Sequence, residues 1–109
     1  MGDENLTPIS ELWSVYLVLT RFNTLYCGIS NDVARRFQEH CAGAPKGAKA
    51  LRGKGPLQLV YQQEIGTRSL ASRVESRVKK LPRATKDRLM RDDSDLVEYF
   101  RLVDSHSSD

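Results

Sequence analysis

The chain has few of the residues that would cross-link a fold or anchor it in a membrane. Cys27 and Cys41 are the only cysteines in 109 residues, so neither a disulfide framework nor a zinc site is expected. This cysteine usage fits a reduced, cytoplasmic setting. No apolar run approaches the roughly 20 residues of a membrane span, and no signal-peptide pattern opens the chain. These absences predict one soluble domain with a modest core.

Acidic residues are scarce in the middle of the chain. Residues 12–91 contain 16 of the 17 lysines and arginines but 5 of the 14 acidic residues, a net charge of +11. Residues 1–11 carry −3 and residues 92–109 carry −5, which gives the overall +3. A basic body between acidic ends indicates a binding surface for a polyanion. An ordinary solvated surface is the alternative.

Hydrophobic periodicity and turn residues predict the element order β-β-α-β-α-α-α. Asn23 can adopt the positive φ of a tight turn, Ser30 or Asn31 can cap the first helix, and Pro82 interrupts a helical pattern. Four glycines and two prolines make residues 43–56 a loop with room for one helical turn. The expected strands are 13–20, 25–30 and 57–64, and the expected helices end near 42, 81, 91 and 103.

This order predicts an α+β domain in which helices flank a small three-stranded, mainly antiparallel sheet. We expect the core at residues 12–91 and a frayed polar arm at residues 1–11. Residues 92–109 form an acidic helix and tail, of which residues 105–109 are expected to be disordered.

Two predicted helices carry ionisable residues on otherwise apolar faces. Arg36 and His40 lie with Val33 and Phe37 on one face of the first helix, where they border a cleft or simply pack at the edge of the core. Glu75 interrupts the apolar stripe of the helix at 67–81. A buried carboxylate is unfavourable unless it is paired or binds a metal. The sequence leaves open a metal ligand or a salt bridge to an arginine such as Arg36, Arg73 or Arg77.

The predicted hairpin places a tyrosine on each arm. Tyr16 and Tyr26 are good strand formers and, taken alone, fit a core role. Gly28 weakens a short strand and often marks the close approach of a ligand or another backbone.

A loop without acidic residues follows the first helix. No acid occurs between His40 and Glu64, while glycines separate a set of cations: Lys46, Lys49, Arg52 and Lys54. Flexible backbone with unpaired cations suits phosphate contacts that position a nucleic-acid strand, although a solvated loop is the alternative.

Taken in order, these segments resemble the GIY-YIG endonucleases and, within them, the small stand-alone YhbQ-like subgroup. No single motif is strong, but the ordered set over residues 12–91 is specific. The matching segments are Ser14-Val15-Tyr16, Tyr26-Cys27-Gly28-Ile29, Asp32 to His40, Lys46 to Gly53, and Ala71 to Glu75. The first motif lacks its Gly and Ile, the second has Cys27 in place of Ile, and the late active-site Asn of many members has no counterpart.

The resemblance implies hydrolysis of phosphodiester bonds with one divalent cation, Mg²⁺ or Mn²⁺, held by Glu75. Arg36 would bind the phosphate, and Tyr16 would be the general base, with Tyr26 as the alternative. His40 would orient a tyrosine or relay its proton, and the metal, His40 and Arg36 would stabilise the phenolate. The partner would be DNA rather than RNA. The expected nucleic-acid contacts are Gly28, Arg35, Lys46, Lys49, Arg52 and Lys54.

A shared site requires both tyrosines to face the same side of the sheet. A two-residue turn at Phe22-Asn23 would send Tyr16 and Tyr26 to opposite faces, so we predict an odd-length loop or a bulge within residues 19–25. Two other functions fit parts of the sequence. One is a non-catalytic nucleic-acid-binding module that keeps the basic loop, and the other is a protein-interaction domain that uses the acidic tail.

Overall fold

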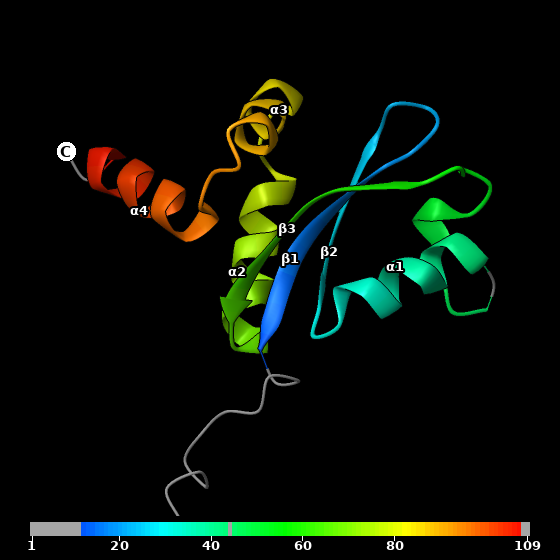
Figure 1. Ribbon diagram of the computed structural model, residues 1–109. Helices are drawn as coiled ribbons and strands as arrows, with labels where there is room; N and C mark the ends of the chain where they lie inside the picture. Colours follow the sequence, from blue (N-terminus) through cyan, green and yellow to red (C-terminus); the bar gives the residue numbers. More distant parts are fainter. Residues whose placement is uncertain (1–11, 44, 108–109) are drawn as a thin grey trace, which may run out of the picture.

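A three-stranded antiparallel sheet organises the chain (Figure 1). The computed structural model describes residues 12–43 and 45–107. Strand β1 (Trp13–Leu19) lies in the centre, between β2 (Leu25–Ser30) and β3 (Gln58–Gly66). Because β1 has neighbours on both edges and packing on both faces, its residues 15 to 18 are all buried. The α+β architecture and the element order predicted from the sequence are confirmed.

Helices cover the two faces of the sheet unequally (Figure 1). Helix α1 (Val33–Ala42) and a short 3₁₀ turn, η3 (Lys49–Leu51), pack on one face. Helices α2 (Arg68–Lys79), α3 (Arg83–Arg91) and α4 (Leu96–Ser107) pack on the other. Within the part of the chain that is described, no helix is long and apolar enough to cross a membrane.

Alternation along β1 separates two hydrophobic clusters. Val15 and Leu17 point to the α2 face, where the cluster also contains Tyr61, Val78 and other apolar residues of α2, α3 and α4. Tyr16 and Val18 point to the α1 face, where the cluster contains Val33 of α1 and Leu51 of η3. Successive side chains of a strand point to opposite faces, so each half of β1 serves one layer.

The β1–β2 hairpin closes with a five-residue loop, as the shared-site argument predicts. Leu19 pairs with Leu25, which leaves residues 20–24 as the loop, and Asn23 adopts φ 64°. Tyr16 pairs with Gly28 and Val18 with Tyr26. Since Tyr16 and Val18 are two residues apart on β1, the two tyrosine side chains lie on the same face of the sheet.

Several predicted boundaries differ from the structure. Asp32, rather than Ser30 or Asn31, is the N-cap of α1, because β2 continues through Ser30 and the Asp32 side chain accepts the backbone N–H of Arg35. Strand β3 runs two residues past the predicted end, to Gly66. The tail was predicted to be disordered from residue 105, but α4 continues to Ser107. The predicted arm at 1–11 and residues 108–109 lie outside the described residues.

Candidate active site

The centre of the α1 face is a hydrogen bond between the first-motif tyrosine and a histidine. Tyr16 Oη lies 2.7 Å from His40 Nε2, and both side chains are buried, with exposed fractions of 1% and 3%. The other ring nitrogen of His40, Nδ1, accepts the backbone N–H of Ala48 at 3.2 Å. A neutral imidazole with an acceptor at Nδ1 carries its proton on Nε2. His40 therefore donates to Tyr16, which favours orientation of the tyrosine over removal of its proton.

Tyr26 completes an aromatic group around this bond. Its ring centroid lies 5.4 Å from that of His40, edge to face, and 6.4 Å from that of Tyr16. Tyr26 is half-buried, so one side of the group is open to solvent. The hairpin register and α1 thus bring three sequence-predicted site residues together.

Gly28 makes room for the Tyr16 phenol. A Cβ atom at this position would lie 2.6 Å from Tyr16 Oη and 2.7 Å from Cζ, closer than side chains tolerate. The sequence predicted a close approach at Gly28, and the structure identifies the approaching group as Tyr16. Gly28 is buried, so its expected contact with nucleic acid is not supported.

Arg36 joins the same cluster, one helical turn before His40. Its Nη1 donates to Glu39 Oε1 at 2.9 Å and to the backbone oxygen of Lys46 at 2.6 Å. Both of these bonds use Nη1, and the guanidinium also hydrogen-bonds Tyr16. Glu39 sits three residues after Arg36, a spacing at which helical side chains meet, yet the sequence reasoning missed its anchoring role.

Burial opposes ionisation of the central pair. Burial has the largest effect on Tyr16 and raises the pKa of its phenol above the ordinary value, while the nearby Arg36 guanidinium lowers this pKa. Burial also lowers the pKa of His40, and the Arg36 cation adds to this effect. The lowered pKa and the Ala48 N–H at Nδ1 both favour a neutral His40 that donates a hydrogen bond over the cationic His40 expected from the sequence. Arg36 is the cation that favours the phenolate.

Glu75 approaches the cluster from the other face of the sheet. Helix α2 packs most closely against β2, the edge strand that carries Tyr26 and Gly28. The Cys27 thiol lies on the α2 side of this strand, where burial and, to a smaller extent, the Glu75 carboxylate together raise its pKa to about 12. Glu75 and Tyr16 thus flank one edge strand from opposite sides.

The Glu75 side chain is 19% exposed, and its partner is the exposed Lys79, whose Nζ lies 3.4 Å from Oε2. The alternative salt bridge to an arginine is not formed, since Arg77 pairs with Asp104 and Arg36 with Glu39. Among the described residues, Glu75 included, no group of three or more acidic, histidine or cysteine side chains could hold a metal ion. A single hard oxygen ligand fits a Mg²⁺ or Mn²⁺ ion that keeps most of its waters and binds substrate oxygens.

Comparison with known proteins identifies the family to which this sequence belongs. The sequence model of the GIY-YIG catalytic domain matches residues 12–88, which include all five candidate catalytic residues. The chain belongs to the GIY-YIG family.

Relatives of this GIY-YIG protein include the UPF0213 protein YhbQ of Escherichia coli K12. It is 51% identical over 88 residues, which cover 81% of this chain and 86% of that protein. A UPF0213 protein of Citrobacter koseri is 53% identical over 78 residues, covering 72% and 76% of the two chains. The solution NMR structure of the UPF0213 protein BH0048 from Bacillus halodurans is 36% identical and covers 73% of this chain and 83% of that one, with a TM-score of 0.47.

The basic loop of this GIY-YIG domain is more ordered than its glycine content predicts. The Lys54 carbonyl accepts the Arg21 N–H at 3.1 Å, the Gly43 carbonyl accepts the Gly47 N–H at 2.7 Å, and Leu51 is 3% exposed. The expected flexible backbone is therefore replaced by one fixed to α1 and to the hairpin. The cations remain at the surface: within residues 12–43 and 45–107 no acidic side chain pairs with Lys46, Lys49, Arg52 or Lys54. Arg35 is also exposed, on α1.

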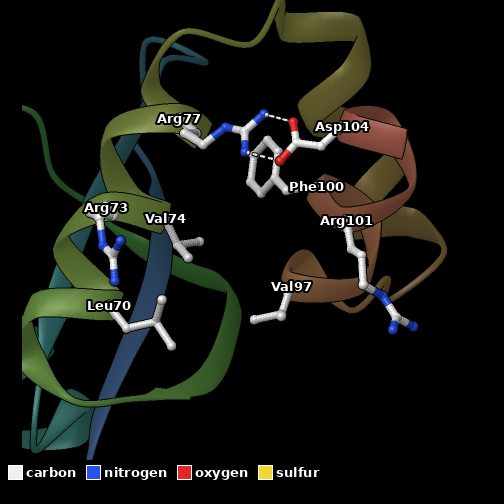
Figure 2. A pocket seen from close by; sticks show the side chains of 8 residues that line it. All are labelled: Leu70, Arg73, Val74, Arg77, Val97, Phe100, Arg101 and Asp104. Carbon is white, nitrogen blue, oxygen red and sulfur yellow. Dashed lines mark hydrogen bonds and ion pairs between the residues drawn. The ribbon is translucent and has the colours of Figure 1, made fainter. Parts of the chain in front are cut away.

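A groove on the other face of this GIY-YIG protein contains none of the candidate catalytic residues. It has a volume of about 540 Å³ and lies between α2 and α4, on the face of the sheet opposite Tyr16. Figure 2 shows Arg77 and Asp104 meeting across it, through hydrogen bonds of 2.8 and 2.9 Å, beside the Phe100 ring. A bidentate ion pair across the groove joins the two helices, so we assign this feature to packing.

Proposed function

We propose that this protein is a metal-dependent endonuclease that hydrolyses phosphodiester bonds in nucleic acid, with DNA preferred over RNA. The observation that carries the proposal is the cluster at β2. Tyr16, Tyr26, His40 and Arg36 meet on one side of this edge strand, and Glu75 lies against its other side. A non-catalytic nucleic-acid-binding module would not require all five. Two free cysteines fit a role in the reducing cytoplasm.

Tyr16 is the proposed general base. Its phenolate would accept the Nε2–H of His40 and lie near the Arg36 guanidinium, and both stabilise negative charge on oxygen. Because Nδ1 of His40 accepts the Ala48 N–H, Nε2 already carries a proton and His40 would not take the Tyr16 proton. Half-buried Tyr26 lies beside this pair, where it can hydrogen-bond the attacking water or the phosphate.

Arg36 is the proposed phosphate ligand. The contacts of Nη1 with Glu39 and Lys46 hold the guanidinium plane, so the remaining N–H groups keep a fixed direction. A pre-positioned cation favours the more highly charged transition state over the ground state. The exposed loop cations and Arg35 would contact phosphates on either side of the cleaved bond.

Glu75 is the proposed ligand of Mg²⁺ or Mn²⁺. The Lys79 ion pair is surface-exposed and contributes little, so displacing it costs little free energy. When bound, the ion would neutralise charge on the scissile phosphate and on the leaving oxygen.

Cleavage of plasmid, single-stranded and branched DNA and of RNA, with Mg²⁺, Mn²⁺ or EDTA, tests the proposal. Wild-type protein should cut in a metal-dependent manner. Glu75→Gln should lower the rate by at least about a hundredfold, because loss of the ion removes several kcal/mol of transition-state stabilisation. Glu64→Gln, the same change at an exposed carboxylate of β3, is the matched control and should cut normally.

Binding without cleavage would identify the alternative, a non-catalytic nucleic-acid-binding module. In that case affinity would fall steeply with salt, through the loop cations, while Glu75→Gln would bind like wild type. The same titration excludes a protein-interaction domain if nucleic acid binds at all.

A further inference from the structure

A second cavity, which lies on the α1 face, adjoins the proposed catalytic centre. It has a volume of about 480 Å³ and lies between the end of α1 and the loop at residues 51–57. His40 is one of the residues that line it, and the His40 side chain bonds to Tyr16, so the cavity and the centre meet at this residue. The proposed function uses the exposed cations of this loop but not the cavity.

The walls of the cavity are suited to a flat ring. Leu51, Pro56 and Leu57 supply apolar surface, while Gly53 and Gly55 contribute bare backbone. Backbone without side chains lets a planar group lie close against the peptide units. Apolar atoms make up most of the lining, and a site with apolar walls and a few polar groups is typical of ligand pockets.

The polar groups of the cavity are hydrogen-bond acceptors at one end and a cation at the other. The carbonyls at the C-terminus of α1 point towards the end of the helix, and Pro45 has no N–H to offer the Cys41 carbonyl four residues before it. Arg52 is exposed at the opposite wall. No acidic residue lines the cavity. These walls complement a ring with amino donors at its edge and a phosphate attached nearby.

We propose that this cavity binds an unstacked nucleobase of the substrate strand, the base of a nucleotide next to the scissile phosphate. The inference rests on the proposed function for the position of that phosphate. We assign a nucleobase to the cavity because the cavity reaches His40 and because the loop that lines it is positively charged. The cavity would make cleavage depend on the presence of a base at one position, and would favour single-stranded or distorted substrates, in which a base leaves the stack at little cost.

An abasic-site scan tests the cavity through cleavage. Single-stranded oligonucleotides with one abasic site at each successive position are compared with the intact strand. Removing the base at one position beside the cut should lower kcat/KM by about tenfold, the lower end of what stacking of one base contributes. The substitution Ala42→Phe places a ring at the exposed end of α1, in the cavity wall. Because this ring would block the cavity, the variant should cut intact and abasic strands equally slowly. Ala84→Phe, at an exposed position of α3, is the matched control and should keep the wild-type dependence.

Disulfide trapping tests the cavity without cleavage. Cys41 is exposed and lines the cavity, whereas Cys27 is buried. In EDTA, Tyr16→Phe protein is mixed with oligonucleotides that carry an activated thiol on one base, scanned along the strand. Cross-linking should peak at one position and disappear in the additional Cys41→Ser variant.

The two experiments separate the two proposals. If the protein cuts but no abasic position matters, and cross-linking is equal at all positions, the cavity proposal is wrong and the nuclease proposal stands. If the protein cuts nothing while cross-linking peaks at one position, the cavity binds a base and the nuclease proposal is wrong. Absence of both cleavage and cross-linking overturns both.

Discussion

The two faces of the sheet differ in what their interiors contain. The α2 face is covered by three helices, and its cluster consists of apolar residues with the Tyr61 hydroxyl at its border. The α1 face is covered by one helix and a loop, and buries the His40–Tyr16 pair among a few apolar side chains. One face therefore stabilises the domain, while the other uses part of its core for polar groups that hydrogen-bond one another. Substitutions should separate these roles.

The largest effect should follow removal of one hydroxyl from the α1 face. Tyr16→Phe keeps the ring that fills the cluster but removes the proposed base, so kcat should fall by about 10²- to 10⁴-fold. The ring remains packed, but the buried Nε2–H of His40 loses its acceptor, so the free energy of unfolding should fall by about 1–3 kcal/mol. The matched variant is Tyr61→Phe, which removes a hydroxyl from the α2 face, where it donates to Ser94 and Gln63. Tyr61→Phe should lower stability and leave the cleavage rate per folded molecule unchanged; equal losses of rate in both variants would contradict the division.

A large truncation on the α2 face should produce the reverse pattern. Phe100 is 7% exposed and packs under the Arg77 guanidinium, 4.4 Å from the ring centroid. Phe100→Ala should cost about 3–5 kcal/mol of unfolding free energy because it leaves a cavity. Urea denaturation measures this cost. Cleavage at a temperature where the variant is folded should match wild type, and a loss of kcat there would mean that α4 supports the site directly.

Gly28→Ala should lower both the stability and the cleavage rate, each to a smaller extent, because Gly28 lies where the ring of the proposed base packs against the strand. The new Cβ would meet Tyr16 Oη at 2.6 Å, so the phenol must move away from His40. Overpacking of this kind costs about 1–3 kcal/mol, and kcat should fall with it. A double-mutant cycle with Tyr16→Val checks the cause. The penalty for Gly28→Ala should largely disappear once the ring is gone, whereas an unchanged penalty would point to a different clash.

Taken for a change of one pH unit, the smallest effect should be that of pH. The proposed base is active as the phenolate, and burial raises the pKa of Tyr16, so only a small fraction ionises at neutral pH. The rate should rise by about tenfold per pH unit through neutrality, until the phenol is ionised. His40 adds no inflection above its ordinary pKa, because its own pKa is lowered. A flat profile in wild type, or an equal slope in Tyr16→Phe, would contradict the assignment of the base.

The fold and the membership of the site were largely predictable from the sequence. Alternation in β1 and the spacing of Arg36 and His40 on α1 are local periodicities, and local patterns determine which face a side chain takes. The odd-length loop followed from requiring Tyr16 and Tyr26 to share a face. The requirement that both tyrosines share one site thus predicted the register of the β1–β2 hairpin, which residue preferences alone did not.

Features that depend on contacts between distant segments were not predictable in the same way. Arg77, two residues from Glu75 on α2, faces away from it and meets Asp104 on α4, a contact that no local pattern predicts, while Glu75 pairs with Lys79, four residues along the helix. The order of the basic loop depends on Leu51 reaching the core and on the Arg21 N–H. The tautomer of His40 is set by the backbone of Ala48, eight residues away, whose N–H no side-chain pattern reveals.

The position of the Tyr16 hydroxyl has a thermal consequence. Strand backbone at Gly28 limits where the ring can lie, and the backbone of Ala48 directs the histidine that holds it. Core strands open only close to global unfolding, whereas loops open at a lower free energy. Heating should therefore release the Ala48 contact with His40 before the strand at Gly28 gives way, so the hydroxyl should lose its hydrogen-bond partner at a lower temperature than the ring loses its place.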